Sequence, residues 1–324
     1  MSQPQMSNED STPNSLEPTI PIRIGAGSFA TIFSSPGRSI VFKVAHSQLD
    51  SATVREEFNS LHSVYTLCNS DSIFAIPRAF AFYDPQTQEI FSFPASPPRE
   101  RRRGPRSHFN PQFFAKLPDS ACYVMDRAAP LPMSIGENIR SKYYSERAIA
   151  SGAAFPLLCR LYFGKTLGPL ASRFINPNNF PLDVARYDQL WQERQDDLSP
   201  KEEVAEGMGE MLSKIHWIAG YDARDVEFVM AGAPHAATTR LYVIDYNQMR
   251  AIDRDADDVS PLVDAFFAND PYYPRPMPND ALYKIFAKAY VDSCSEERRG
   301  RAALFLRAIE ARQAATNAAV QMAV

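Results

Sequence analysis

The chain has 324 residues, which is enough to bury a full core in two lobes or two small domains. Its formal net charge is −4 and no run of eighteen apolar residues occurs, so nucleic acid and membranes are not expected partners and a cytoplasmic protein is predicted. The four cysteines (Cys68, Cys122, Cys159 and Cys294) are scattered and have no nearby histidine, which argues against zinc and against a disulfide framework.

The N-terminal part of the sequence predicts a disordered tail followed by a β-rich region. Residues 1–19 are polar and rich in Ser, Asn, Pro and Gln, a composition that does not support a packed core. Apolar runs then predict three strands, at about 21–25, 29–34 and 39–45.

The loop between the first two of these strands and a lysine in the third indicate a nucleotide site. Gly25, Gly27 and Ser28 allow the loop backbone to lie close over a ligand. Lys43 stands alone in an apolar strand, where a buried lysine is costly unless it meets a carboxylate or a phosphate. A dinucleotide-binding loop would be followed by a helix instead of a strand, whereas a simple turn remains an alternative interpretation.

The next elements complete a predicted N-lobe over residues 20–126. A helix is expected at 51–68, where apolar residues recur at helical spacing. Further strands are expected at about 80–83, 89–93 and 121–125, and we predict a five-stranded sheet plus this helix.

A basic insertion at 95–119 interrupts this pattern. The run from Arg99 to Arg106 has no apolar periodicity, and its simplest interpretation is a solvated loop. A nuclear-import signal or a patch for an anionic partner is the alternative interpretation.

Residues 127–324 predict a mainly helical C-lobe. One helix is expected at about 200–217 and two more after about 279, and between them 219–247 predicts a strand hairpin. Asp222 and Glu227 lie at the entry of this hairpin and Asp245 at its far end. Phosphoryl transfer needs a carboxylate near the attacking hydroxyl and others to hold metal ions, which is the chemistry that these three acids would supply.

These features resemble a protein-kinase-like fold, and more closely a fungal family of kinase-like proteins whose members are often labelled zinc finger proteins. The closer resemblance rests on four strings, which are Ile215-His216-Trp217, Asp222 to Val229, Ile244 to Gln248, and Asp270 to Pro276. It implies an α+β, bilobal structure with a small β-rich N-lobe and a mainly helical C-lobe.

The resemblance also implies roles for N-lobe residues. Gly25, Gly27 and Ser28 would belong to a phosphate-covering loop, with Ala30 where kinases have a third glycine. Lys43 would bind phosphates. Glu57 would be the helix residue that pairs with this lysine, and Glu56 is the alternative. Met125 and Asp126 would lie where the lobes join and would meet the adenine base.

In the C-lobe, the resemblance implies that Asp222 is the catalytic-loop aspartate and that Glu227 and Asp245 bind metal. The implied cofactors are ATP with Mg²⁺ or Mn²⁺, and the implied partners are a nucleotide and a small-molecule acceptor, with room for a protein partner.

Departures from the kinase pattern leave two functions open. Gly220 and Tyr221 replace the His-Arg that precedes the catalytic aspartate, Glu227 replaces an asparagine, and Asn247 replaces the glycine of D-F-G. No Ala-Pro-Glu segment follows, which argues against a peptide substrate. We therefore expect either an ATP-dependent phosphotransferase acting on a small hydroxylated acceptor, which is slightly favoured, or a pseudokinase without transfer activity.

Overall fold

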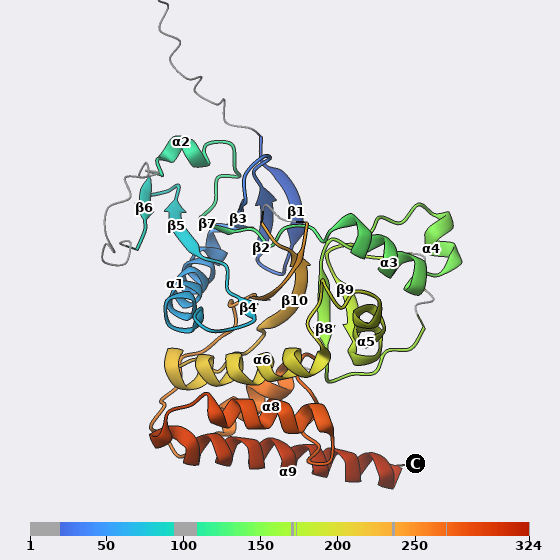
Figure 1. Cartoon of the computed structure of the whole chain (residues 1–324). Coiled ribbons are helices and arrows are strands. Elements are labelled where there is room, and N and C mark those ends of the chain that lie inside the picture. The colour runs from blue at the N-terminus through green and yellow to red at the C-terminus, as the bar shows by residue number, and fades with distance from the viewer. Residues whose placement is uncertain are drawn as a thin grey trace, which may run out of the picture.

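The computed structural model describes residues 20–93, 109–169, 172, 174–234, 237–269 and 271–323. The expected tail at 1–19 and the basic run from Arg99 to Arg106 lie outside the described residues. The chain is an α+β protein with two lobes, a β-rich one formed by its N-terminal part and a largely helical one formed by the rest (Figure 1). This is the bilobal, protein-kinase-like architecture.

The N-lobe sheet has six strands in the order β1-β2-β3-β7-β5-β6, and every neighbouring pair is antiparallel. The strands are β1 (Ile22–Ala26), β2 (Ala30–Ser34), β3 (Ile40–Ala45), β5 (Ala79–Asp84), β6 (Glu89–Phe91) and β7 (Cys122–Asp126). The prediction of a five-stranded sheet was wrong by one strand: all six expected strand segments belong to the sheet, because the short strand β6 also pairs with β5 at its edge.

Helix α1 (Ser51–Cys68) follows the 3₁₀ turn η1 (Gln48–Asp50) and packs on one face of this sheet. Its apolar side chains recur every three or four residues and are buried, and they are Val54, Phe58, Leu61 and Val64. Phe58 meets the ring of Phe82 at 6.0 Å and that of Tyr123 at 5.9 Å. This packing fixes which side of α1 faces the sheet.

The C-lobe contains a second sheet, with the order β4-β11-β10-β8-β9, where the sequence predicted only one hairpin. Its strands are β4 (Phe74–Ala75), β8 (Cys159–Tyr162), β9 (Phe180–Asp183), β10 (Glu227–Gly232) and β11 (Thr239–Ile244). β10 and β11 form the antiparallel hairpin within 219–247. The added strands are two to four residues long, which is too short to show a clear alternation in the sequence.

Helices α6, α8 and α9 lie in successive layers below this sheet (Figure 1). The remaining helical bounds are α2 (Pro111–Phe114), α3 (Met133–Tyr143), α4 (Glu146–Ala150), α5 (Val184–Glu193), α6 (Lys201–Ser213), η2 (Lys214–Ala219, a π-helix), α7 (Ser260–Ala268), α8 (Ala281–Asp292), η3 (Glu296–Arg298) and α9 (Arg299–Ala323). Gly209 permits the close approach of α6 to α8, because a Cβ there would lie 2.2 Å from the backbone oxygen of Phe286.

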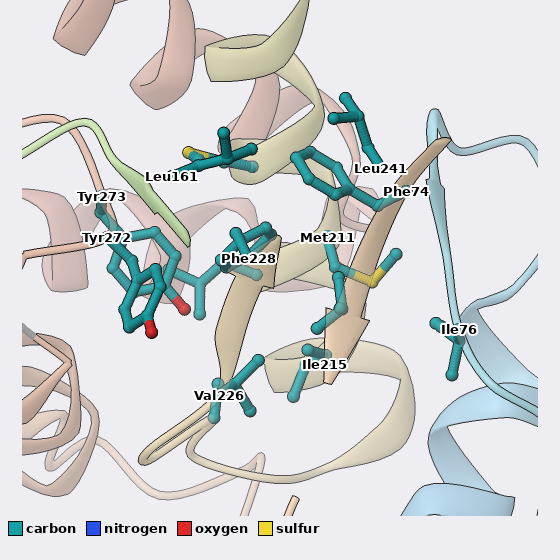
Figure 2. Packing of buried hydrophobic residues seen from close by; sticks show 14 of the residues in the cluster. Phe74, Ile76, Leu161, Met211, Ile215, Val226, Phe228, Leu241, Tyr272 and Tyr273 are labelled. Carbon is teal, nitrogen blue, oxygen red and sulfur yellow. The ribbon is translucent and has the colours of Figure 1, made fainter. Parts of the chain in front are cut away.

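The C-lobe core lies between the sheet and these helices. Figure 2 shows Phe228 of β10 among the side chains of this core. Its ring centroid lies 4.9 Å from that of Phe74 and 5.4 Å from that of Tyr273. Met211 of α6 and Ile215 of η2 belong to the same buried cluster. Because β10 is buried along its whole length, the residues at its entry are held rigidly.

All four cysteines are buried and unpaired. Burial raises the pKa of the Cys68 and Cys122 thiols to about 12. Among the helices that the structure describes, none combines the length and the apolar character needed to cross a bilayer.

Candidate active site

The side chain of Lys43 joins the two lobes. Its Nζ donates to Glu57 Oε1 at 2.6 Å and to Asp245 Oδ1 at 3.1 Å, although Lys43 and Asp245 are 202 positions apart. Lys43 is only 7% exposed. Burial by itself lowers the pKa of this ammonium, but the charges of Glu57 and Asp245 outweigh burial, so the pKa is raised overall. Lys43 is therefore a firmly charged cation.

Glu57 is held between Lys43 and the chain that follows β11. The backbone N–H of Tyr246 donates to Glu57 Oε1 at 3.3 Å, and Asp245 itself adopts a left-handed conformation with φ of 65°. Burial raises the pKa of Glu57, Lys43 opposes this effect and Asp245 adds to it. Glu56 is exposed, so the structure places Glu57 at the lysine.

The turn at residues 25–30, between β1 and β2, covers the site and forms its roof. The N–H of Gly27 donates to the carbonyl of Ala30 at 2.8 Å, which closes the turn, and the Phe29 ring lies 5.2 Å from Lys43 Nζ. Across the mouth of the cleft, the amide of Asn178 donates to the carbonyl of Ile24 at 2.8 Å. The roof is thus attached to both lobes.

Beneath the roof lies a cleft of about 710 Å³. Nine of the ten residues that the sequence singled out line it, and they are Gly25, Gly27, Ser28, Lys43, Glu57, Met125, Asp126, Glu227 and Asp245. The carboxylate of Asp126 accepts from the backbone N–H of Arg78 at 2.9 Å, and the backbone N–H of Asp126 donates to the carbonyl of Arg78 at 3.1 Å.

Asp222 is the exception, because it is not among the described residues that line the cleft. It is 1% exposed and its carboxylate is fully engaged. Oδ1 accepts from the N–H groups of Arg224 and Arg250 at 3.1 and 2.9 Å, and Oδ2 accepts from Arg250 Nε at 2.7 Å. The structure thus shows Asp222 as an anchor between two segments of backbone.

Asp225 lines the cleft instead, and sequence reasoning missed it. Its φ is 64°, and its Oδ2 accepts from the side-chain amide of Gln248 at 2.8 Å. Burial raises the pKa of Asp225, and the charge of Asp245 adds to that effect while Arg160 and Lys43 oppose it. One feature of the sequence could have indicated it. Asp225 lies two residues before Glu227 at the start of a strand, and this spacing can place both carboxylates on the same side of the strand.

Arg160 of β8 is a second residue that the sequence analysis missed. Its Nη1 lies 2.9 Å from Glu227 Oε1, and it lines the cleft. Burial raises the pKa of Glu227 to about 7; Arg160 opposes this shift, and the charges of Asp245 and Asp225 add to it. A lone charge within an apolar run, the same pattern that drew attention to Lys43, was the available signal.

Several other histidine and tyrosine side chains of the C-lobe belong to its core. His216 is buried, its Nδ1 lies 2.7 Å from the hydroxyl of Tyr290, and burial lowers its pKa to about 3. Tyr273 packs against Phe228 of β10, and Tyr272 packs against Tyr162 of β8 (Figure 2). His235 and Asp270 lie outside the described residues.

The carboxylates at the cleft suit a hard cation. Within the described part of the chain, no group of three or more His, Cys, Asp or Glu side chains is arranged to enclose a metal ion. Burial raises the pKa of Glu227 and the charge of Asp245 adds to this shift, so a cation bound at Glu227 would favour its charged form. Mg²⁺ is commonly held by one or two carboxylates together with substrate phosphates, which this donor set fits.

Comparisons with known proteins give a partial match. A family model described as "Zinc finger protein" matches residues 241–299, which include two of the strings that carry the resemblance above. The matched segment contains one cysteine, Cys294, and no histidine, too few for a set of four zinc ligands. No curated protein matches.

One solved structure, titled "WaaP in complex with acyl carrier protein", is similar over 91% of this chain and 87% of that chain. The sequence identity is 15% and the TM-score is 0.38. The kinase-like fold class of this chain rests instead on its two lobes and on the contacts of Lys43 with Glu57 and Asp245.

Proposed function

We propose that the protein binds ATP with a divalent cation in the interlobe cleft and transfers the terminal phosphoryl group to a small hydroxylated acceptor. The observation that carries this proposal is the bridge from Lys43 to Glu57 and Asp245 beneath the turn at residues 25–30. A buried cation that lines such a cleft is suited to bind phosphate oxygens.

Each part of the cleft would then act on a different part of the nucleotide. The backbone of Gly25, Gly27 and Ser28 would cover the phosphates, and Lys43 would bind them while Glu57 holds the lysine in place. The adenine base would lie against Met125 and Asp126, which also line the cleft.

Asp245 and Glu227 would hold Mg²⁺ or Mn²⁺. When bound, this cation would neutralise charge on the phosphate oxygens. Arg160 is paired with Glu227, so its guanidinium would change position when a cation binds to that carboxylate.

A pseudokinase that binds nucleotide without transferring phosphate is the second candidate. The observation that favours it is the position of Asp222, which is buried and bonded to Arg250 rather than facing the cleft. The absence of His-Arg before Asp222 points in the same direction.

The test is the thermal stability of the full chain with ATP and either Mg²⁺ or Mn²⁺. At a hundred times its dissociation constant a ligand adds ~2.7 kcal/mol of stability. Lys43→Met should weaken ATP binding at least tenfold, whereas Lys284→Met, at an exposed position of α8, should leave it unchanged. If no nucleotide and cation stabilises the wild type, or if Lys43→Met binds normally, the proposal is wrong. Binding without any ATP turnover would support the pseudokinase alternative.

A further inference from the structure

The turn that leads into β10 presents a carboxylate to the cleft. Asp225 lines the cleft together with Glu227 and Asp245, and Gln248 donates to one of its oxygens at 2.8 Å. The side chain is only partly buried. It is therefore placed to meet a molecule that enters beside the phosphates of a bound nucleotide.

This position is maintained against backbone strain. Ala223 has a φ of 55° and Asp225 a φ of 64°, left-handed conformations that are unfavourable for residues with a Cβ. Strain of this kind is retained where surrounding contacts over-determine the backbone, and it is concentrated at functional sites.

A single buried side chain supplies those contacts. Asn269 is 3% exposed, and its Oδ1 accepts from the N–H of Asp225. Its Nδ2 donates to the carbonyl of Ala223 at 2.6 Å and to that of Val226 at 3.4 Å. All three bonds hold the strained turn, and through it they fix the direction of Asp225.

Asp222 has a different task in the same turn. Its carboxylate accepts three hydrogen bonds, two of them from Arg250, and no face of it opens on the cleft.

We propose that Asp225, and not Asp222, orients the acceptor hydroxyl, and that Asn269 is the residue that positions it. This inference rests on the proposed phosphotransferase function. The acceptor oxygen forms a bond to the terminal phosphorus while the bond from that phosphorus to the bridging oxygen breaks. ADP leaves with that electron pair, and the hydroxyl proton passes to the Asp225 carboxylate.

The experiment uses the full chain with Mn²⁺ and ATP, and water serves as the acceptor. Hydrolysis of ATP and the ATP-induced rise in melting temperature are both measured. Asp225→Asn should lower kcat roughly 100-fold or more, as loss of a general base does, without weakening ATP binding. Asp222→Asn should lower the melting temperature of the unliganded protein and retain hydrolysis per folded molecule.

Asn269→Ser separates positioning from simple stability. It should lower kcat per folded molecule while the KM for ATP stays unchanged, because Asp225 is still present but is less firmly oriented.

The inference is overturned if Asp225→Asn hydrolyses ATP normally, or if Asp222→Asn abolishes hydrolysis with its melting temperature intact. It also fails if the wild type binds ATP but does not hydrolyse it, and in that case the nucleotide site itself stands. A wild type that binds no ATP refutes the proposed function instead.

Discussion

The pH dependence of stability should change when Glu227 is replaced by glutamine. This carboxyl is 8% exposed and its pKa rises from 4.5 to about 7, first because of burial and then because of Asp245 and Asp225. Its proton is therefore bound more tightly in the folded chain than in the unfolded chain. The contribution of this bound proton to the free energy of unfolding is complete below pH 4.5 and is lost as the pH rises through 7.

The magnitude follows from the two pKa values. A change of one pKa unit is 1.36 kcal/mol, so the rise from 4.5 to about 7 makes the loss between pH 4.5 and pH 8 about 3 kcal/mol. Glutamine stays neutral at every pH and can still accept a hydrogen bond from Arg160. The free energy of unfolding of Glu227→Gln, relative to wild type, should therefore increase by up to that amount over this range.

The assay is urea unfolding in EDTA at pH 5, 6, 7 and 8. Glu89→Gln, the same substitution at an exposed position of β6, is the matched control for the effect of the substitution itself. A difference between Glu227→Gln and wild type that stays flat with pH, or that falls as pH rises, would refute the assignment of a raised pKa to this carboxyl.

Three further predictions concern packing, the roof and the cation. Gly209→Ala should destabilise the fold by about 1–3 kcal/mol, because the new Cβ would meet the backbone of α8. Gly300→Ala should stabilise the fold by about 0.5–1 kcal/mol, because α9 has open space at that position. Chemical denaturation of both variants measures these changes. Asn178→Ala should speed amide hydrogen exchange in β1 while costing the whole fold about 1 kcal/mol or less, and unchanged exchange would show that the bond to Ile24 does not hold the roof. Mn²⁺ should raise the melting temperature more at pH 8 than at pH 6, because cation and proton compete for Glu227, and equal shifts at both pH values would contradict a site there.

The sequence was most informative where a charge stood out against an apolar strand. It predicted a phosphate-binding role for Lys43 and a metal-binding role for Asp245, and the Nζ of Lys43 lies 3.1 Å from Asp245 Oδ1. The N-lobe strands were predictable because each contains five or six residues of apolar character, apart from the short edge strand β6.

The choice between Asp222 and Asp225 could not be predicted in the same way. The direction of each carboxylate depends on the left-handed turn at 223–225, and that turn is held by Asn269, 44 residues after Asp225. Spacing along the chain matched Asp222 to a kinase pattern, but long-range hydrogen bonds decide which acid faces the cleft. Arg160 was missed for a related reason, since its partner Glu227 belongs to a strand 67 residues later that pairs with the four-residue β8.

The burial of Cys68, Cys122, Cys159 and Cys294 gives the protein a practical property. The native sulfurs should resist maleimide reagents, because burial disfavours their thiolate form. New cysteines introduced on the surface of each lobe could therefore carry a pair of dyes in the otherwise native chain. Energy transfer between those dyes would report directly whether the two halves draw together when a nucleotide arrives.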